Sequence, residues 1–306
     1  MTQETVVVTA ANIHPNAVAM LNKYRVVYAD VRAGEAALAE LCEQEQPSAI
    51  MVRYGNISER VISASSKLRI IAKHGVGTDN IDKAAAARLG IPVTAALGSN
   101  SQAVAEHTLG LMFSCARMIS WLDARMREGH WDKDNYAGIE LSGATLGLIG
   151  AGAIGKRVAD VALTLGMRVL VSDPYAQPGS LPSGVQMTDL DTIVSASNVI
   201  SLHCPLTADT KQLLNTERLS KMQHRTIIIN TARAGLIDEP ALLKELHEDR
   251  LFAGIDCFED EPLSTNSPWL SAPNTILTPH IGGTTTTAFK QMGVMAAESI
   301  LKHLNA

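Results

Sequence analysis

Three ionisable side chains in the second half of the chain follow predicted strands closely. Arg233, Glu261 and His280 each lie within a few residues of a strand end, and open α/β sheets bind ligands beyond the carboxyl ends of their strands. A histidine can exchange a proton with a substrate hydroxyl, and an arginine can hold a substrate carboxylate. Hydride transfer would need both groups. Taken singly, His280 also fits a surface histidine and Glu261 a helix-capping carboxylate, so spacing alone leaves their roles open.

A glycine-rich segment provides the most informative local motif. Gly150, Gly152 and Gly155 follow an apolar strand at Thr145–Ile149 and open a predicted helix at Ala153–Leu165. In a dinucleotide-binding turn the first glycine allows the tight turn, the second allows close approach of the pyrophosphate, and the third allows close helix packing. The helix N-terminus would supply free N–H groups and partial positive charge to the phosphates.

Asp173 ends the next predicted strand and indicates which dinucleotide binds. A carboxylate at this point accepts hydrogen bonds from a ribose diol and repels a 2′-phosphate, so NAD is favoured over NADP. The alternative interpretation is a simple glycine turn followed by a solvated aspartate. The strand, the helix and the acid together favour the cofactor site.

The elements that must position these residues alternate between short β-branched runs and Ala- and Leu-rich segments. This alternation predicts parallel sheets joined by crossover helices, in a doubly wound α/β architecture. A polar stretch near Gly98–Ser101 separates the two series and is followed by an apolar helix predicted at Ala103–Ile119. The first series is predicted at Val6–Ala10, Arg25–Ala29, Ala49–Arg53, Arg69–Lys73 and Pro92–Ala96, and the second at Thr145–Ile149, Arg168–Ser172, Asn198–Leu202, Thr226–Asn230, Ala253–Cys257 and Thr275–Thr278.

Composition narrows the function classes. The 306 residues are 46% hydrophobic but only 4% aromatic, which suits aliphatic strands covered by helices, and the net charge is −5 from 26 basic and 31 acidic residues. The interspersed charges predict no nucleic-acid partner. We expect no signal peptide, no membrane span and no metal site. Four scattered cysteines favour a reducing compartment, and therefore a cytoplasmic location.

The sequence resembles the D-isomer-specific 2-hydroxyacid dehydrogenases over nearly its whole length. The order and spacing of seven motifs carry the resemblance: Gly75–Asp82, Val104–Thr108, Gly150–Gly155, Leu202–Leu206, Ile229–Gly235, Asp256–Pro262 and Thr278–Gly283. It implies two doubly wound parallel-sheet domains. A Rossmann NAD-binding domain at 99–284 would be inserted in a flavodoxin-like substrate domain formed by 1–98 and 285–306, with a hinge near Gly98 and Gly283.

The resemblance also implies a catalytic set. Arg233 would bind the substrate carboxylate and carbonyl oxygen, and His280 would be the general acid–base. Glu261 would pair with His280 and raise its pKa. Asp256 would hold the nicotinamide carboxamide. The remaining cofactor-binding residues would be Gly150, Gly152, Ala153, Ile154, Gly155, Asp173, His203, Pro205, Thr231, Ala232 and Gly282.

Substrate contacts are expected mainly in the first domain. The backbone N–H groups of the segment His74–Gly77 would cradle the carboxylate, with Asn100 nearby at the hinge. Arg53 matches a position that faces the distal group of the substrate in phosphoglycerate dehydrogenases. His74 fits either substrate selection or a loop position without contact. Glu106 and His107 lie in an apolar helix and are expected to be structural, and a homodimer through the NAD-binding domain is expected from the family.

Several substrates and one different function remain open. A short phosphoglycerate dehydrogenase, a glyoxylate/hydroxypyruvate reductase, and an enzyme for a sulfonated acid such as sulfolactate all fit, since Arg53, Lys73 and His74 could face a second anion. Glu261 argues against a formate dehydrogenase, in which glutamine typically partners the histidine. Because the sequence ends after its last predicted helix, we expect no C-terminal regulatory domain. An NAD-binding, corepressor-like regulator of the same fold is the alternative function.

Overall fold

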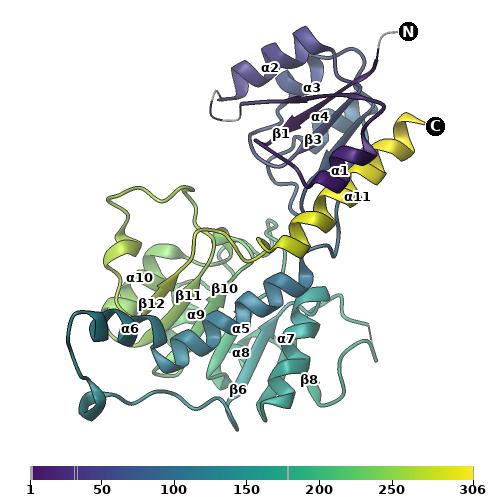
Figure 1. The fold of residues 1–306 in the computed structure, drawn as a ribbon. Coiled ribbons are helices and arrows are strands. Elements are labelled where there is room, and N and C mark those ends of the chain that lie inside the picture. Colours follow the sequence, from purple (N-terminus) through teal and green to yellow (C-terminus); the bar gives the residue numbers. More distant parts are fainter. Residues whose placement is uncertain (1–2, 31, 33, 178, 306) are drawn as a thin grey trace. The chain divides into compact units, whose positions relative to one another are not determined.

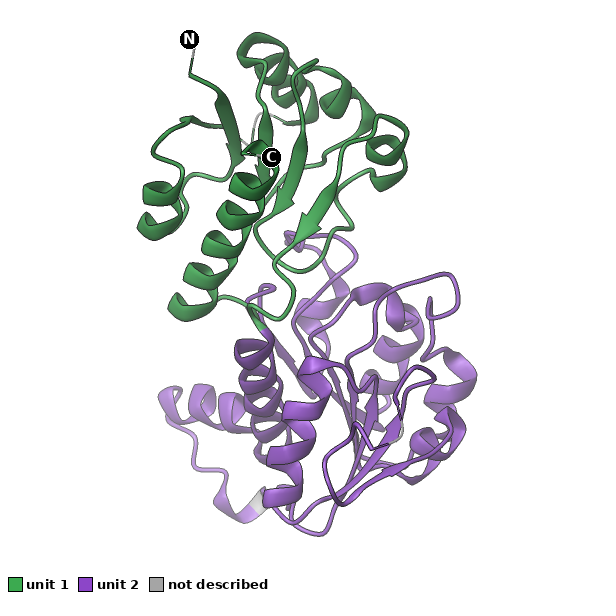
Figure 2. Cartoon of the chain, turned by 90° about the vertical axis from the view of Figure 1, so that its right-hand side faces the viewer, with its two compact units in different colours: residues 1–100, 283–306 green, residues 101–282 purple. Residues whose placement is uncertain are grey.

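The computed structural model describes residues 3–305 except 31, 33 and 178. The chain divides into two compact units, residues 1–100 with 283–306 and residues 101–282 (Figure 2). These bounds lie close to the division expected from the sequence at 98/99 and 284/285. The binding roles given to the two domains stay predictions.

Unit 1 is built around a parallel sheet of five strands in the order β2-β1-β3-β4-β5 (Figure 1). This flavodoxin-like order changes direction between β1 and β3, which creates a switch point at their carboxyl ends. Its elements are β1 Thr5–Thr9, α1 Pro15–Met20, β2 Arg25–Tyr28, α2 Gly34–Glu45, β3 Ala49–Val52, α3 Glu59–Ser63, β4 Ile70–Lys73, α4 Lys83–Arg88, β5 Val93–Ala95 and α11 Thr286–Leu304.

Alternate residues of the unit 1 strands enter two separate cores, because successive side chains of a strand point to opposite faces. Val7 and Ile50 pack beneath α2, α3 and α4. Val6 and Met51 pack on the other face, against α1 and the apolar side of α11. Helix α11 therefore completes the core of unit 1 although it follows unit 2 in the sequence.

Unit 2 contains a parallel sheet of seven strands in the order β12-β11-β10-β9-β6-β7-β8. Helices α5 and α7 cover one face, and α8, α9 and α10 cover the other. Its elements are α5 Ser101–Arg117, α6 Ile119–Arg127, η2 Lys133–Asn135, β6 Thr145–Ile149, α7 Ala153–Thr164, β7 Arg168–Ser172, β8 Val185–Met187, α8 Leu190–Ala196, β9 Val199–Leu202, α9 Thr216–Lys221, β10 Thr226–Asn230, η3 Ala234–Leu236, α10 Glu239–His247, β11 Leu251–Ile255, η4 Pro268–Ser271 and β12 Thr275–Leu277. The predicted fold, two doubly wound parallel sheets with a Rossmann-type strand order in the second, is confirmed.

Three local features differ from the prediction. The helix predicted at Ala103–Ile119 starts at Ser101 and breaks at Met118, whose φ of 48° is left-handed, and α6 follows. Strand β11 is Leu251–Ile255 rather than Ala253–Cys257, because the register with β10 pairs Thr226 with Leu251 and Asn230 with Ile255. The short edge strand β8 was missed, since three partly or fully exposed residues are too few to show a periodic pattern.

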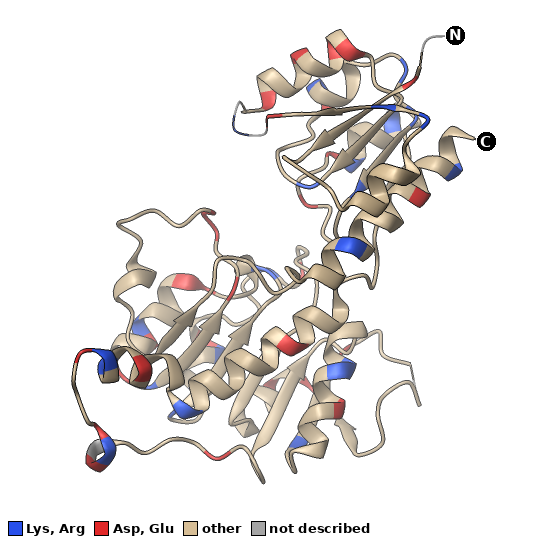
Figure 3. Ribbon diagram, viewed as in Figure 1, with Lys and Arg blue, Asp and Glu red and all other residues tan. Residues whose placement is uncertain are grey.

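Charged side chains of both signs are interspersed along the elements of each unit (Figure 3). Among the helices of the described residues, none has both the length and the apolarity that a membrane span requires. In the same residues, no cluster of three or more His, Cys, Asp or Glu side chains could hold a metal ion.

Candidate active site

The three glycines of the β6–α7 turn each occupy a different environment. A Cβ on Gly150 would lie 2.7 Å from the His203 carbonyl carbon, and Gly150 has a φ of 101° that favours glycine. A Cβ on Gly155 would lie 2.3 Å from the Gly150 carbonyl oxygen. A Cβ on Gly152 would meet no protein atom within 4 Å. Gly150 and Gly155 therefore serve packing, whereas the open space at Gly152 suits close approach of a cofactor phosphate.

Helix α7 begins with N–H groups that fit a pyrophosphate. Its N-cap residue is Gly152, and no side chain caps these N–H groups. The carboxylate of Asp173 accepts hydrogen bonds from the backbone N–H groups of Ala151 (2.7 Å) and Tyr175 (2.8 Å). Because each carboxylate oxygen has two lone pairs, Asp173 can fix the glycine turn and still accept a ribose hydroxyl.

Four more of the predicted cofactor residues, namely His203, Pro205, Thr231 and Ala232, lie on loops that follow β9 and β10. His203 follows β9, and one ring nitrogen, Nε2, lies 2.9 Å from the Ser201 hydroxyl. Burial lowers the pKa of His203 to about 4, so its ring is neutral near pH 7. Pro205 is exposed, and its carbonyl oxygen accepts a hydrogen bond from the Thr210 hydroxyl. The Thr231 hydroxyl lies 2.9 Å from that of Thr108 on α5.

The Arg233 loop is organised by the buried amide of Asn230, the last residue of β10. Its Oδ1 accepts a hydrogen bond from Ala232 N (3.0 Å), and its Nδ2 donates to the Arg233 carbonyl oxygen (2.9 Å). The Arg233 side chain donates to the Ala232 carbonyl oxygen (2.6 Å). Thr231, Ala232 and Arg233 are all partly buried. The loop thus carries a cation at the carboxyl edge of the sheet.

His280 and Glu261 form a hydrogen-bonded pair. The His280 Nδ1 lies 2.9 Å and 2.8 Å from the two oxygens of the Glu261 carboxylate. Glu261 is itself fixed, because its Oε1 accepts a hydrogen bond from Phe258 N (2.9 Å). An imidazole whose Nδ1–H is held by a carboxylate has its Nε2 directed outward, which is the arrangement a general acid–base requires.

Asp256 is almost fully buried, at 1% exposure. Its carboxylate accepts hydrogen bonds from the Thr278 hydroxyl and from the backbone N–H groups of Ile281 and Gly282. The Thr278 hydroxyl, the Ile281 N–H and the His107 ring all lie on the Oδ1 side of the carboxylate. Among the described residues, only the Gly282 N–H donates to Oδ2, which leaves that oxygen able to accept one more donor, such as the predicted carboxamide.

In unit 1, the predicted carboxylate cradle follows β4, but the His74 N–H donates to the Val52 carbonyl oxygen (2.8 Å) and is therefore not part of it. Gly75 has a φ of 148°, and its carbonyl oxygen accepts a hydrogen bond from Ala96 N. The backbone N–H groups of Val76 and Gly77 donate to no atom of the residues that the structure describes. Free N–H groups in a tight loop favour anion binding. Asn100 packs against Gly283, where a Cβ would lie 2.7 Å from the Asn100 Nδ2.

Arg53 directly follows β3, beside the switch point of the unit 1 sheet. Its guanidinium carbon lies 5.0 Å from the centre of the Tyr54 ring and 4.8 Å from that of Phe289. Within the described part of the chain, its side chain forms no ion pair with a carboxylate. Two aromatic rings therefore orient a cation whose hydrogen-bonding edge is left for another group.

His74 is buried at 3% exposure and packs on Phe289, with 5.2 Å between ring centres. Neither ring nitrogen has a hydrogen-bond partner among the described residues. Burial, opposed by a backbone hydrogen bond and assisted by the charges of Arg53 and Lys73, lowers the pKa of His74 to about 4. The structure gives His74 a packing role, and contact with substrate stays a prediction.

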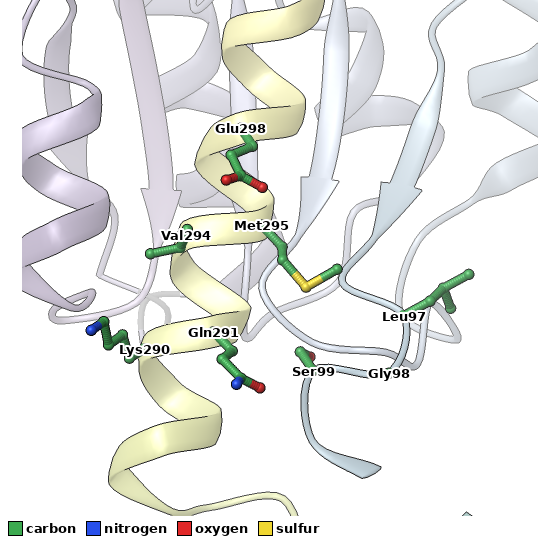
Figure 4. Close-up of a pocket in the computed structure, with 8 residues that line it drawn as sticks. All are labelled: Leu97, Gly98, Ser99, Lys290, Gln291, Val294, Met295 and Glu298. Carbon is green, nitrogen blue, oxygen red and sulfur yellow. The ribbon is translucent and has the colours of Figure 1, made fainter. Parts of the chain in front are cut away.

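Unit 1 also contains a pocket of about 500 Å³ (Figure 4). The segment Leu97–Ser99 lines one side, and Lys290, Met295 and Glu298 of α11 line the other. None of the predicted site residues lines it. The candidate site is therefore defined by its chemistry rather than by this cavity.

Comparison with known proteins identifies the family. Residues 109–282 match the NAD-binding domain of the D-isomer-specific 2-hydroxyacid dehydrogenases. The chain belongs to this family. It is 43% identical over 251 residues to a hydroxypyruvate reductase of Thermotoga maritima, which covers 81% of each chain. It is 38% identical over 296 residues to a D-3-phosphoglycerate dehydrogenase of Methanocaldococcus jannaschii, which covers 95% of this chain and 56% of that protein.

The chain thus spans about half the length of the phosphoglycerate dehydrogenases that it matches. Among solved structures, a D-lactate dehydrogenase of Aquifex aeolicus in complex with NAD and lactic acid superimposes with a TM-score of 0.88 at 26% identity, covering 99% of this chain and 96% of that one. This family member is an NAD-dependent oxidoreductase that transfers hydride between the cofactor and a D-2-hydroxy acid or 2-keto acid.

Sequence reasoning did not select three residues that support the candidate site. Asn230 holds the Arg233 loop, Thr278 binds Asp256, and Thr108 contacts Thr231. Each lies within or beside a family motif, but as a small polar residue it carried no chemical signal of its own. Their hydrogen-bond partners reveal their roles, and those of Thr278 and Thr108 are distant in the sequence.

Proposed function

We propose that this dehydrogenase uses NADH to reduce a small 2-keto acid that carries a second anionic group, with 3-phosphohydroxypyruvate as the favoured substrate. The observation that supports this choice is Arg53, a cation without a carboxylate partner in the described residues, next to the switch point of the unit 1 sheet. Ligands of such sheets bind at the switch point, and a guanidinium suits a phosphate or sulfonate.

In this proposal, residues of the chain bind the substrate and move the proton. Arg233 and the free N–H groups of Val76 and Gly77 bind the carboxylate. His280 donates its Nε2 proton to the keto oxygen, while Glu261 keeps the ring oriented and stabilises the imidazolium before transfer. When bound, NADH supplies the hydride. The β6–α7 turn and Asp173 hold the dinucleotide.

A keto acid without a second anion is the other candidate substrate. The 43% identity to a hydroxypyruvate reductase favours it. The two substrates make different demands on Arg53, because only the phosphorylated or sulfonated acids offer it a charged partner. The ratio of rates with the two substrates therefore discriminates between them.

The test is NADH oxidation with a panel of keto acids, with NADPH in parallel. The panel holds 3-phosphohydroxypyruvate, hydroxypyruvate, glyoxylate, pyruvate and sulfopyruvate. We expect the highest kcat/KM with a keto acid that carries a second anionic group. Arg53→Gln should lower kcat/KM for that acid roughly 100-fold while changing hydroxypyruvate reduction little. Arg60→Gln, an equal charge change at an exposed site on α3, is the matched control.

Equal losses for both substrates in Arg53→Gln would contradict the proposed role of Arg53. Preference for hydroxypyruvate in the wild type would identify the second candidate. If no keto acid of the panel is reduced although NADH still binds, the result would favour the corepressor-like regulator instead.

We also propose a homodimer formed through unit 2. Ile119, Trp121, Met126 and Trp131 are between 44% and 74% exposed on and after α6. Arg125 fixes this segment by a bidentate hydrogen bond to Asp132, and such exposed apolar side chains are typical of an interface. Sedimentation of the wild type and of Trp131→Asp tests the dimer.

The four unpaired thiols support the cytoplasmic location that we propose.

A further inference from the structure

The backbone of the loop that carries His280 is strained. His280 has a φ of 53°, a left-handed conformation that non-glycine residues rarely adopt. Such a conformation persists only where the surrounding contacts hold it. The His280 side chain is also 48% exposed, and its hydrogen bonds within the described residues are to Glu261. The contacts that fix the loop must therefore lie on either side of His280.

Asp256, which follows the neighbouring strand β11, supplies those contacts. The Thr278 hydroxyl, before His280, donates to Asp256 Oδ1 at 2.6 Å. The N–H groups of Ile281 and Gly282, after His280, donate to Oδ1 at 2.9 Å and to Oδ2 at 2.8 Å. A single buried carboxylate thus holds both ends of the segment.

The hydrogen-bond directions around Thr278 fix the role of His107. Burial by itself would raise the pKa of Asp256, but hydrogen bonds from His107, Thr278 and the two N–H groups outweigh burial and lower it, so the carboxylate is ionised. An ionised carboxylate only accepts, and Thr278 has one hydroxyl proton, which goes to Asp256. The His107 Nε2, at 2.9 Å from the Thr278 hydroxyl oxygen, must therefore be the donor.

His107 also lies close to the carboxylate itself, with 3.3 Å between its Nε2 and Asp256 Oδ1. Its neighbour Thr108 contacts Thr231 in the Arg233 loop at 2.9 Å. A Cβ on Gly282 would lie 2.9 Å from Asp256 Oδ2 and 3.5 Å from the His107 ring. One turn of α5 is therefore packed against the loops of both reactive side chains.

We propose that His107, acting through Thr278 and Asp256, is a positioning residue that holds His280 in the geometry required for proton transfer. The role rests on the proposed function of His280 as acid–base. Among the described residues, no hydrogen bond or ion pair joins His107 to His280 or Glu261. It therefore acts through the backbone of residues 278–282. This replaces the purely structural role expected from the sequence.

The first test separates kcat from binding. His107→Leu and Thr278→Val each remove one hydrogen-bonding group with little change of volume. With the panel's best substrate, we expect kcat to fall on the order of 10- to 100-fold, since small misplacement of a reacting group has effects of this size. KM and the NADH Kd should stay within about twofold. Thr278→Ser, which keeps the hydroxyl, should restore most of kcat, and His224→Leu at an exposed site should behave as the wild type.

A second measurement does not depend on turnover. The NMR signals of the His280 ring, assigned by their loss in His280→Gln, report its environment directly at one fixed pH. We expect them to shift or broaden in His107→Leu and Thr278→Val but to keep their wild-type positions in Thr278→Ser. Unchanged His280 signals in both hydrogen-bond variants would overturn the proposal, as would an unchanged kcat.

The two proposals can fail separately. If the wild type reduces none of the keto acids, the proposed substrates are contradicted, while the NMR comparison still tests the positioning role. If His107→Leu does not fold, the Thr278→Val and Thr278→Ser pair decides the question alone. If kcat falls in Thr278→Val and is equally low in Thr278→Ser, the loss results from changed packing, and the hydrogen-bonding role is overturned.

Discussion

At the scale of single residues, the candidate site depends on polar groups whose hydrogen bonds are fixed by buried partners. Both ends of the Asn230 amide are used within its own loop, so Arg233 is presented by a rigid backbone. Phe258 N fixes Glu261 in the same way, and Glu261 in turn orients His280. Preorganised charge of this kind stabilises a transition state without reorganisation during the reaction.

Replacement of Arg233 tests this view. Arg233→Ala should lower kcat/KM by ~3 kcal/mol of transition-state stabilisation, or ~10²-fold, as expected for loss of one preorganised electrostatic contact. Steady-state kinetics with the best keto acid measure the effect, and Arg225→Ala, remote from the reacting groups and stacked on Phe252, is the control. A value within twofold of the wild type would remove Arg233 from the site.

His74 predicts a dependence of stability on pH. Its pKa is about 4 in the folded chain, against an ordinary value of 6.5, because burial disfavours the charged ring. The unfolded chain therefore binds a proton first as the pH falls, and stability present above pH 6.5 is lost between pH 6.5 and 4. The loss is on the order of 3 kcal/mol from His74 alone.

Urea unfolding at several pH values checks this prediction. His74→Leu should flatten the fall in the free energy of unfolding between pH 6.5 and 4, whereas His224→Gln, at an exposed site, should leave it unchanged. His203 titrates in the same direction and should account for part of the fall that remains. An equally steep fall in His74→Leu would show that His74 is not the group responsible.

At the scale of elements, different glycines at the β6–α7 turn serve helix packing and cofactor binding. A Cβ on Gly155 would lie 2.3 Å from the Gly150 carbonyl oxygen, so Gly155→Ala must displace helix or turn. We expect a loss of about 1–3 kcal/mol of stability, as for other overpacked sites. Thermal unfolding of the purified variant should show it as a lower Tm.

Gly152→Ala is the matched variant in the same turn. Its Cβ would meet no protein atom within 4 Å, and Gly152 has a φ of −71° that alanine adopts readily. The Tm should therefore stay at the wild-type value, while NADH affinity, measured by fluorescence titration, should fall at least ~10-fold because the phosphates can no longer approach. Undiminished NADH affinity would place the pyrophosphate elsewhere.

At the scale of the whole molecule, the two units differ in how their cores are assembled. Unit 2 is continuous in the sequence, from residue 101 to 282. Unit 1 is discontinuous, and α11 covers one face of its sheet with Ala296, Ala297, Ile300 and Leu304. Removal of α11 would expose the buried side chains Val6, Val8 and Met51, and the lost burial of each is worth about 1.5–3 kcal/mol.

Fragments of the chain test this difference. Residues 101–282 should unfold cooperatively and bind NADH, whereas residues 1–100 alone should lack cooperative unfolding. A short Gly/Ser linker from Asn100 to Gly283, which are in contact, should restore the fold of unit 1. Circular dichroism during heating measures all three fragments. Cooperative unfolding of residues 1–100 alone would show that α11 is dispensable.

The sequence by itself determined the type and order of most elements. Strands such as Thr226–Asn230 and Thr145–Ile149 are buried on both faces, so their continuous apolar runs are visible without a structure. The glycine turn and Asp173 were equally clear, because cofactor chemistry restricts both residue type and spacing. The Arg233, Glu261 and His280 set depended on resemblance, since strand-end spacing alone left other roles open.

The tertiary structure decided the features that depend on contacts between distant residues. The His107–Thr278 contact joins residues 171 positions apart, and neither residue type predicts it. The break at Met118 and the edge strand β8 have no apolar pattern to mark them. Hydrophobic periodicity records which face of an element is buried, but hydrogen-bond partners are chosen only when loops from different strands meet at one edge of a sheet.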